Sequence, residues 1–379
     1  MNSKAISENT AVKNERSAAE ASEGIALGNA WTRFWFTAIP QTGMRCLRVI
    51  AGTVILCWLL SFLGHHRALF SVNGLVDFDT HSQLQGPEYE GTGPIGWSIL
   101  YVTNGNPAAF EMIYWLSIAV VLLFTLGVAT RLTAAATWVI TVSFLYNPAT
   151  SYEGDYMIAI VAFYMMLGHL FAGFWNGDLS LAEKFLGSKR DFLFANVAFG
   201  PETDLPAPST SANWMLRMLQ IHFVMIMLAN GLHKFQLADW WAGVALWYPL
   251  HSPFQTTAES IMRERPTATF TLFWLSLFQY AVLAWQIGFP TFAWKPGWPR
   301  VILLGGAVAY WFGMFFVFRL PLFGPFVVIG CLSYLRPEEW AAIADRTTGW
   351  MKRETPKLTK AQIEAKKPAP LANKEAIKK

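Results

Sequence analysis

Long apolar runs recur along this chain and constrain its fold more than any other feature. A run of about twenty apolar residues with few charges is long enough to cross the hydrocarbon core of a bilayer as a helix. We expect eight such helices, at about 43–64, 108–129, 132–148, 156–175, 212–233, 268–290, 300–318 and 320–335. The third, seventh and eighth runs are short, so seven or nine helices also fit. The sequence therefore predicts an all-α, polytopic integral membrane protein.

The composition supports a membrane protein and argues against several soluble classes. Hydrophobic residues make up 54% of the chain and charged residues 14%, against about 25% charged in soluble domains. The three cysteines lie at unrelated positions in apolar segments, without metal-ligand or disulfide spacing. The sequence shows neither a phosphate-binding glycine loop nor a His/Cys metal cluster. We therefore expect no metal cofactor, and we assign the net charge of +4 to contact with anionic lipid and not to nucleic acid.

The distribution of lysine and arginine predicts the topology. Placing Arg131, Lys184, Lys189 and the basic tail inside leaves an acidic set of loops outside, as the positive-inside rule requires. Both termini are then cytoplasmic in a multi-pass protein of the inner membrane. We expect three regions: a disordered segment at 1–28, a transmembrane domain at 29–336 and a basic, largely disordered tail at 337–379. The transmembrane domain would open with a surface helix at 29–39, and its loop at 65–107 would form a lid.

Polar side chains gather where the fifth apolar run ends. They are Asn230, His233, Lys234 and Asp239. Ionisable groups at the mouth of a membrane-spanning segment are costly, so they are default candidates for a functional site. If the helix continues to Lys234, then His222, Asn230, His233 and Lys234 fall within an arc of about 120°. This predicts one polar stripe facing inward. Alternatively, Lys234 extends its amine to the lipid headgroups, beside an interfacial belt of Trp240 and Trp241.

Several motifs resemble one family of membrane proteins. The sequence GLHKF at 231–235, followed by Asp239-Trp240 and Gly243, resembles the Gly-x-x-Lys-Leu…Asp-Trp…Gly stretch of the vitamin K-dependent gamma-carboxylases and of the related horizontally transferred transmembrane (HTTM) family. GVATR at 127–131, a Ser-x-x-x-Asn at 143–147 and Gly154-Asp155 are similar to further motifs of that family. WQIGFP at 285–290 resembles a Trp-Glu-x-Gly-x-Pro stretch. The resemblance spans about residues 32–336 and implies the HTTM fold.

The resemblance also implies a chemistry. In the animal carboxylases, oxygenation of a reduced naphthoquinone produces a strong base, and a lysine amine starts the sequence by deprotonating the hydroquinone. Lys234 matches that lysine, so the implied cofactor is menaquinol or a vitamin K-like quinol. A lysine amine is almost fully protonated in water at neutral pH, so it acts as a base only where burial favours the neutral amine. The expected catalytic residues are Lys234, His233 and Asp155. The expected substrate-binding residues are His222, Asn230, Asp239, Trp240, Gln286 and Tyr310.

Two functions therefore remain open for the chain. The first is a quinol-dependent oxidoreductase or carboxylase-like lyase, with its site on the outer (periplasmic) face and with lipid and quinone as partners. The second is a non-catalytic scaffold or subunit that packs against a protein partner or a second copy. Gln286 stands where the family more often has a carboxylate, and Tyr310 where a histidine is expected, and both departures favour the scaffold. Burial of Lys234 discriminates between the two functions.

Overall fold

The computed structural model places most of the predicted transmembrane domain. It describes residues 28–71, 74–75, 98–103, 106–146, 150, 154–171, 208–250, 258–340 and 342–343. Within these ranges the regular structure is helical, apart from one isolated bridge between Ile39 and Ser209. The chain divides into two units, Met1–Leu335 and Arg336–Lys379, and the apolar helices belong to the first. Most of the N-terminal segment predicted to be disordered, most of the predicted lid and most of the predicted tail lie outside the described residues.

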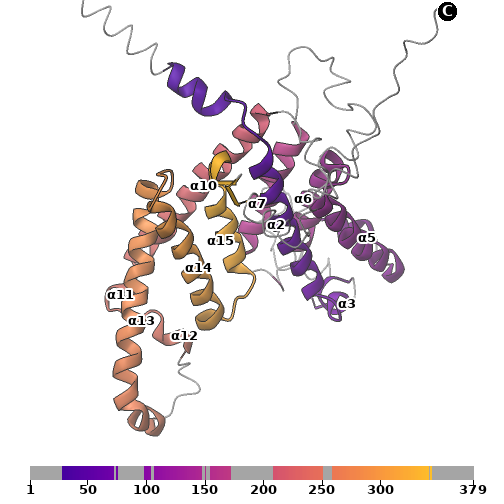
Figure 1. Ribbon diagram of the computed structural model, residues 1–379. Coiled ribbons are helices and arrows are strands. Elements are labelled where there is room, and N and C mark those ends of the chain that lie inside the picture. The colour runs from indigo at the N-terminus through magenta and orange to yellow at the C-terminus, as the bar shows by residue number, and fades with distance from the viewer. Residues whose placement is uncertain are drawn as a thin grey trace, which may run out of the picture. The chain divides into compact units, whose positions relative to one another are not determined.

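Every predicted apolar run contains a helix (Figure 1). The helices are α2 (Thr42–Ser61), α5 (Pro107–Leu126), α6 (Thr130–Leu145), α7 (Asp155–Leu170), α10 (Thr210–Phe235), α13 (Ala258–Phe292), α14 (Pro299–Phe318) and α15 (Phe323–Leu332). Shorter elements are α3 (His66–Phe70), η2 (Ile99–Thr103), α11 (Ala238–Trp241) and α12 (Trp247–Leu250). Among the described helices, five are long and apolar enough to cross a membrane: α2, α5, α10, α13 and α14. Helices α6, α7 and α15 are shorter, so eight spans and their orientation stay predictions.

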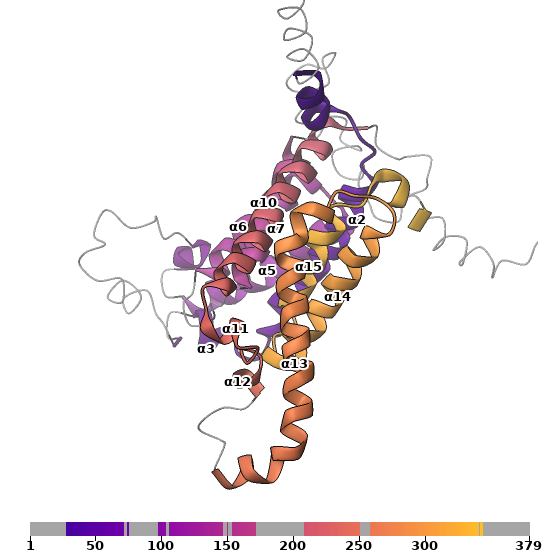
Figure 2. The ribbon, with the colours of Figure 1, turned by 90° about the vertical axis from the view of Figure 1, so that its left-hand side faces the viewer.

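Contacts between neighbouring helices follow a closed order. Helix α2 packs on α5, α5 on α6, α6 on α7, and α7 on α10. The order continues from α10 to α13, α14 and α15, and α15 returns to α2 (Figure 1, Figure 2). Helix α7 also contacts α2 and α15. The helices thus bury side chains against one another, while their outer faces keep exposed aromatic residues such as Phe312 and Phe316, as expected beside lipid.

Local sequence signals explain where the helices begin and end. Asn106 caps α5, because its side-chain oxygen accepts hydrogen bonds from the backbone N–H groups of the first turn, and Pro107 occupies the first helical position. The same helix ends at Gly127, whose φ of 90° lies in the left-handed region that favours glycine. Pro299 likewise starts α14. These signals turn a continuous apolar sequence into separate helices.

The predicted surface helix is present at 28–36 and is fastened to the start of α10. Asn213 Nδ2 donates hydrogen bonds to the carbonyl oxygens of Phe34 and Trp35, at 2.9 and 3.1 Å. The bridge between Ile39 and Ser209 lies beside these bonds. Helices α2 and α10 therefore begin at the same end of the bundle. Lys234 lies about 30 Å from Asn213 along α10, at the opposite end.

Candidate functional site

The Lys234 amine is bound between α10, α11, α13 and α14. Its Nζ donates a hydrogen bond to Gln286 Oε1 at 2.6 Å. The same nitrogen lies 4.9 Å from the ring centroid of Trp240 and 6.0 Å from that of Tyr310. Gln286 is fully buried, whereas the other three side chains are half-buried. The structure thus brings together four residues that the sequence nominated separately. We call these four residues the Lys234 cluster.

A glycine allows α10 to approach α13 at this point. A Cβ atom at Gly231 would lie 2.9 Å from the Ile287 side chain and 3.3 Å from the Gln286 Cβ. Gly231 is itself buried in α10, one turn before Lys234. A larger residue here would separate the two helices and lengthen the distance from the amine to Gln286. The glycine of the GLHKF motif therefore has a packing role in forming the cluster.

Polar side chains of α13 hold the turn that follows α10. Gln279 Nε2 donates to the carbonyl oxygens of Trp240 at 2.6 Å and of Asp239 at 3.3 Å. Ser276 Oγ donates to the carbonyl oxygen of Gly243 at 2.7 Å. Tyr280 Oη donates to the carbonyl oxygen of Trp241 at 2.7 Å. These donors belong to the apolar span Thr269–Phe292. Non-helical backbone beside such a span is tolerated only where protein groups satisfy it. Gln279 therefore fixes Trp240 in its position against Lys234.

The α14 side of the cluster is positioned by Trp285. The ring of Trp285 stacks on Tyr310, with centroids 6.1 Å apart and planes 25° from parallel. Trp285 Nε1 also donates a hydrogen bond to the carbonyl oxygen of Ile302 at 3.1 Å. Gly306 makes room for this indole, since a Cβ there would overlap its five-membered ring. Residues on both α13 and α14 thus determine where the Tyr310 ring lies.

The contacts of the cluster favour one protonation form of Lys234. A carbonyl acceptor and two aromatic faces all stabilise an ammonium ion. Gln286 Nε2, in contrast, is buried without a hydrogen-bond partner. An unsatisfied buried N–H costs about 1–3 kcal/mol, so this atom is a donor available to a bound acceptor. The arrangement provides a cation, an amide donor and aromatic surface in one place.

Three other predicted site residues on this side of the bundle are exposed. They are Asn230, His233 and Asp239. The predicted inward-facing stripe is therefore wrong for Asn230 and His233, because α10 turns its Gly231 and Lys234 side toward α13 instead. Asp239 contributes its backbone, whose carbonyl oxygen accepts bonds from Val244 N and Ala245 N in the turn.

His222 and Asp155 are not part of the cluster as described. His222 Nδ1 forms a hydrogen bond with Tyr164 Oη of α7 at 2.9 Å, and it lies about 18 Å from Lys234 along α10. Asp155 is the first residue of α7, and its side chain lies outside the described residues. The catalytic role expected for Asp155 therefore stays a prediction.

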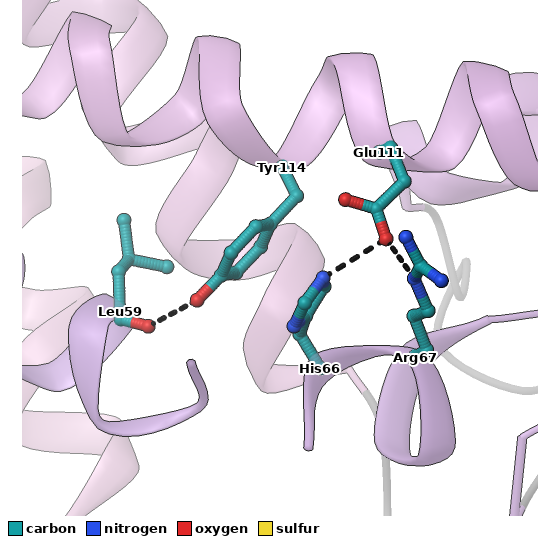
Figure 3. A network of polar contacts seen from close by, with 5 residues as sticks. All are labelled: Leu59, His66, Arg67, Glu111 and Tyr114. Carbon is teal, nitrogen blue, oxygen red and sulfur yellow. Dashed lines mark hydrogen bonds and ion pairs between the residues drawn. The ribbon is translucent and has the colours of Figure 1, made fainter. Parts of the chain in front are cut away.

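A second polar network was missed by the sequence reasoning. Glu111 Oε1 accepts a hydrogen bond from His66 Nε2 at 3.0 Å and another from Arg67 Nε (Figure 3). The His66 ring stacks on Tyr114 at 4.4 Å, and Tyr114 Oη donates to the Leu59 carbonyl oxygen at 2.8 Å. The network joins α2, α3 and α5. A glutamate inside an apolar run was the available signal, but its partners lie about 45 residues away in sequence.

No protein-family model, no curated protein and no solved structure matches the chain.

Proposed function

We propose that the Lys234 cluster binds the ring of a reduced naphthoquinone, and that the chain is an inner-membrane enzyme of the HTTM and gamma-carboxylase-like type that oxidises this quinol. The observation that carries the proposal is the bond between Lys234 Nζ and Gln286 Oε1, formed beside two aromatic rings. The resemblance of the surrounding motifs gives the reaction class.

The residues of the cluster fit a quinol in three respects. Trp240 and Tyr310 supply aromatic surface beside Lys234, and a naphthoquinone ring packs favourably against such surface. Gln286 Nε2 is a buried donor without a partner, and a quinol or quinone oxygen would accept its hydrogen bond. Helices α13 and α14 expose apolar and aromatic side chains, along which an isoprenoid tail could extend into lipid.

The contacts of Lys234 give this residue a particular role in the proposal. With these contacts, Lys234 as an ammonium ion would stabilise the negative charge that develops on a quinol oxygen during oxidation. A neutral lysine base, as the resemblance implies, would require the amine to leave these contacts first. A bound quinol supplies the electrons for reaction with oxygen, while Gln286 and the aromatic rings orient it.

The alternative is the non-catalytic scaffold, and one observation favours it. A hydrogen bond between polar side chains on neighbouring membrane helices is a common way to hold such helices together. The bond between Lys234 and Gln286 meets that description, because it joins α10 to α13. On this account the cluster needs no ligand.

A turnover assay separates the two functions. The full chain in nanodiscs would receive menaquinol and oxygen, and quinol consumption and epoxide formation would be measured. The proposal expects turnover by wild type, loss of turnover in Lys234→Ala, reduced turnover in Lys234→Arg, which keeps the positive charge in a different shape, and full turnover in Lys295→Ala, which removes an exposed lysine elsewhere. Well-folded wild type that consumes no quinol, or a Lys234→Ala variant as active as wild type, would support the scaffold.

A further inference from the structure

Two polar side chains are fully buried, without partners, on α2 and α7. Arg48 of α2 has an exposed fraction of 0%, and none of its three guanidinium nitrogens has a hydrogen-bond partner. His169 of α7 also has an exposed fraction of 0%, and neither of its ring nitrogens has a partner. Buried polar groups in proteins are nearly always hydrogen-bonded, so five such atoms together require an explanation. A charged group in this condition is especially costly.

Arg48 and His169 are neighbours where α2 packs on α7. The charges of Arg48 and Arg45 both act on His169. Among the described residues, the ionisable groups that act on Arg48 are Arg45 and Cys46, and neither is a carboxylate. The guanidinium of Arg48 therefore has no carboxylate partner among the described residues.

Apolar side chains from three helices lie beside the pair. The Phe124 ring lies edge-on to the His169 ring, with centroids 6.0 Å apart. A Cβ at Gly168 would contact the Met44 sulfur and the Met215 side chain. In apolar surroundings the local dielectric constant is low, so a hydrogen bond between either polar group and a ligand is stronger than it would be in water.

We propose that Arg48 and His169 form a buried binding site for an oxyanion of the phosphate class. A guanidinium presents its N–H donors in a planar fork that matches two oxygens of a phosphate group. The imidazole adds a further N–H donor. The site is distinct from the Lys234 cluster, because α2 and α10 begin at the same end of the bundle and Lys234 lies near the end of α10.

Two sources could supply this chemistry, namely the headgroup of a phospholipid and free inorganic phosphate. Both present tetrahedral phosphate oxygens to Arg48. They differ in route, since a lipid headgroup reaches the site from the bilayer and free phosphate from water. The test therefore needs one arm for each source.

The experiment is a thermal unfolding titration of the full chain, delipidated in neutral detergent and dialysed against chloride. Tryptophan fluorescence reports unfolding, because the chain has 18 tryptophans. One arm adds sodium phosphate, with sodium chloride of equal ionic strength as control. The other adds short-chain phosphatidylglycerol, with diacylglycerol as control. A saturable rise in the wild-type Tm with either probe is expected, because a ligand that binds the folded state stabilises it.

Variants of Arg48 test whether the rise in Tm comes from binding at this site. Arg48→Gln should abolish it, and Arg48→Lys, which keeps the charge but loses the planar fork, should weaken binding about tenfold or more. Arg300→Gln is the matched control: Arg300 is also a buried arginine, but its Nη1 donates to the Ala293 carbonyl oxygen at 2.6 Å, so this variant should keep the rise.

The results show whether the site binds an oxyanion and whether that oxyanion is free phosphate or a lipid headgroup. A rise with phosphate alone indicates a soluble oxyanion, and a rise that needs phosphatidylglycerol indicates a lipid headgroup. No rise in wild type with either probe overturns the proposal, as does an equal rise in Arg48→Gln. Should Arg48→Gln not fold, Arg48→Lys decides, and wild-type affinity in that variant would overturn the proposal.

Discussion

Gln286 accepts a hydrogen bond from Lys234 at 2.6 Å through one end of its amide, while the other end is buried without a partner. The first contact connects α13 to the end of α10, and the second leaves a donor beside the amine it holds. Holding α10 against α13 would need only the hydrogen bond from Lys234 to Gln286 Oε1. The unused donor is the feature that a ligand with an oxygen acceptor would complete.

Replacing Gln286 should therefore change quinol binding more than folding. Gln286→Leu removes the acceptor for Lys234 and the buried donor together, so the gain and loss in stability largely offset each other. We expect the KM for menaquinol to rise about tenfold, which corresponds to one or two lost hydrogen bonds. Steady-state kinetics in nanodiscs would measure this change. An unchanged KM would exclude contact between Gln286 and the quinol.

Gln279 should contribute to stability through the turn after α10. Gln279→Leu leaves the carbonyl oxygens of Trp240 and Asp239 without their side-chain donor, and we expect a loss of about 1–3 kcal/mol. Tyr280→Phe is the comparison, because its bond to the Trp241 carbonyl oxygen is exposed and worth about 1 kcal/mol or less. Unfolding in detergent, followed by tryptophan fluorescence, would rank the two variants. The reverse order would show that Gln279 does not hold the turn.

Adjacent glycines in α14 should respond differently to the same substitution. A Cβ at Gly306 would overlap the Trp285 indole, so Gly306→Ala should cost about 1–3 kcal/mol and shift the Tyr310 ring that stacks on this indole. A Cβ at Gly305 meets nothing within 4 Å, so Gly305→Ala should be neutral or stabilising by up to about 1 kcal/mol. The free energy of unfolding of both variants would be compared. Equal effects would contradict the packing of α13 against α14.

In the Glu111 network, the bond to the part-buried His66 should contribute more to stability than the bond to the exposed Arg67. Arg67 is 73% exposed at its side chain, so Arg67→Ala should cost about 0–1 kcal/mol. Glu111→Ala also removes the acceptor for His66, whose side chain is 13% exposed, and should cost more. A double-mutant cycle of Glu111 with His66 and of Glu111 with Arg67 would give the two pair energies. A larger coupling to Arg67 than to His66 would contradict this ranking.

Apolar run length was sufficient to locate the helices. All eight predicted ranges contain one, because a helix satisfies its own backbone and its apolar faces are evident in the sequence. Their packing order was not predictable in this way. Contacts such as that of Gly231 with Ile287 depend on which helices meet and at what angle, and single-run hydropathy carries no such information.

The candidate site was predictable in its parts and not in its assembly. Motif resemblance singled out Lys234, Trp240 and Gln286, but a helical wheel placed Asn230 and His233 on the same inward stripe, and both are exposed. The wheel gives the angle of each residue without the direction of the neighbouring helix. Gln279 was overlooked because a glutamine inside an apolar run gives no sign that it will meet the backbone of a distant turn.

Photo-crosslinking with a quinone analogue shows whether the Lys234 cluster binds a naphthoquinone. An azido-naphthoquinone would be irradiated with the full chain in nanodiscs, and the labelled peptides would be identified by mass spectrometry. The account predicts labels in α11 around Trp240 and in α14 around Tyr310, competition by unlabelled menaquinol, and loss of both labels in Lys234→Ala. Labelling elsewhere in the chain, or labelling at these helices that menaquinol does not reduce, would contradict it.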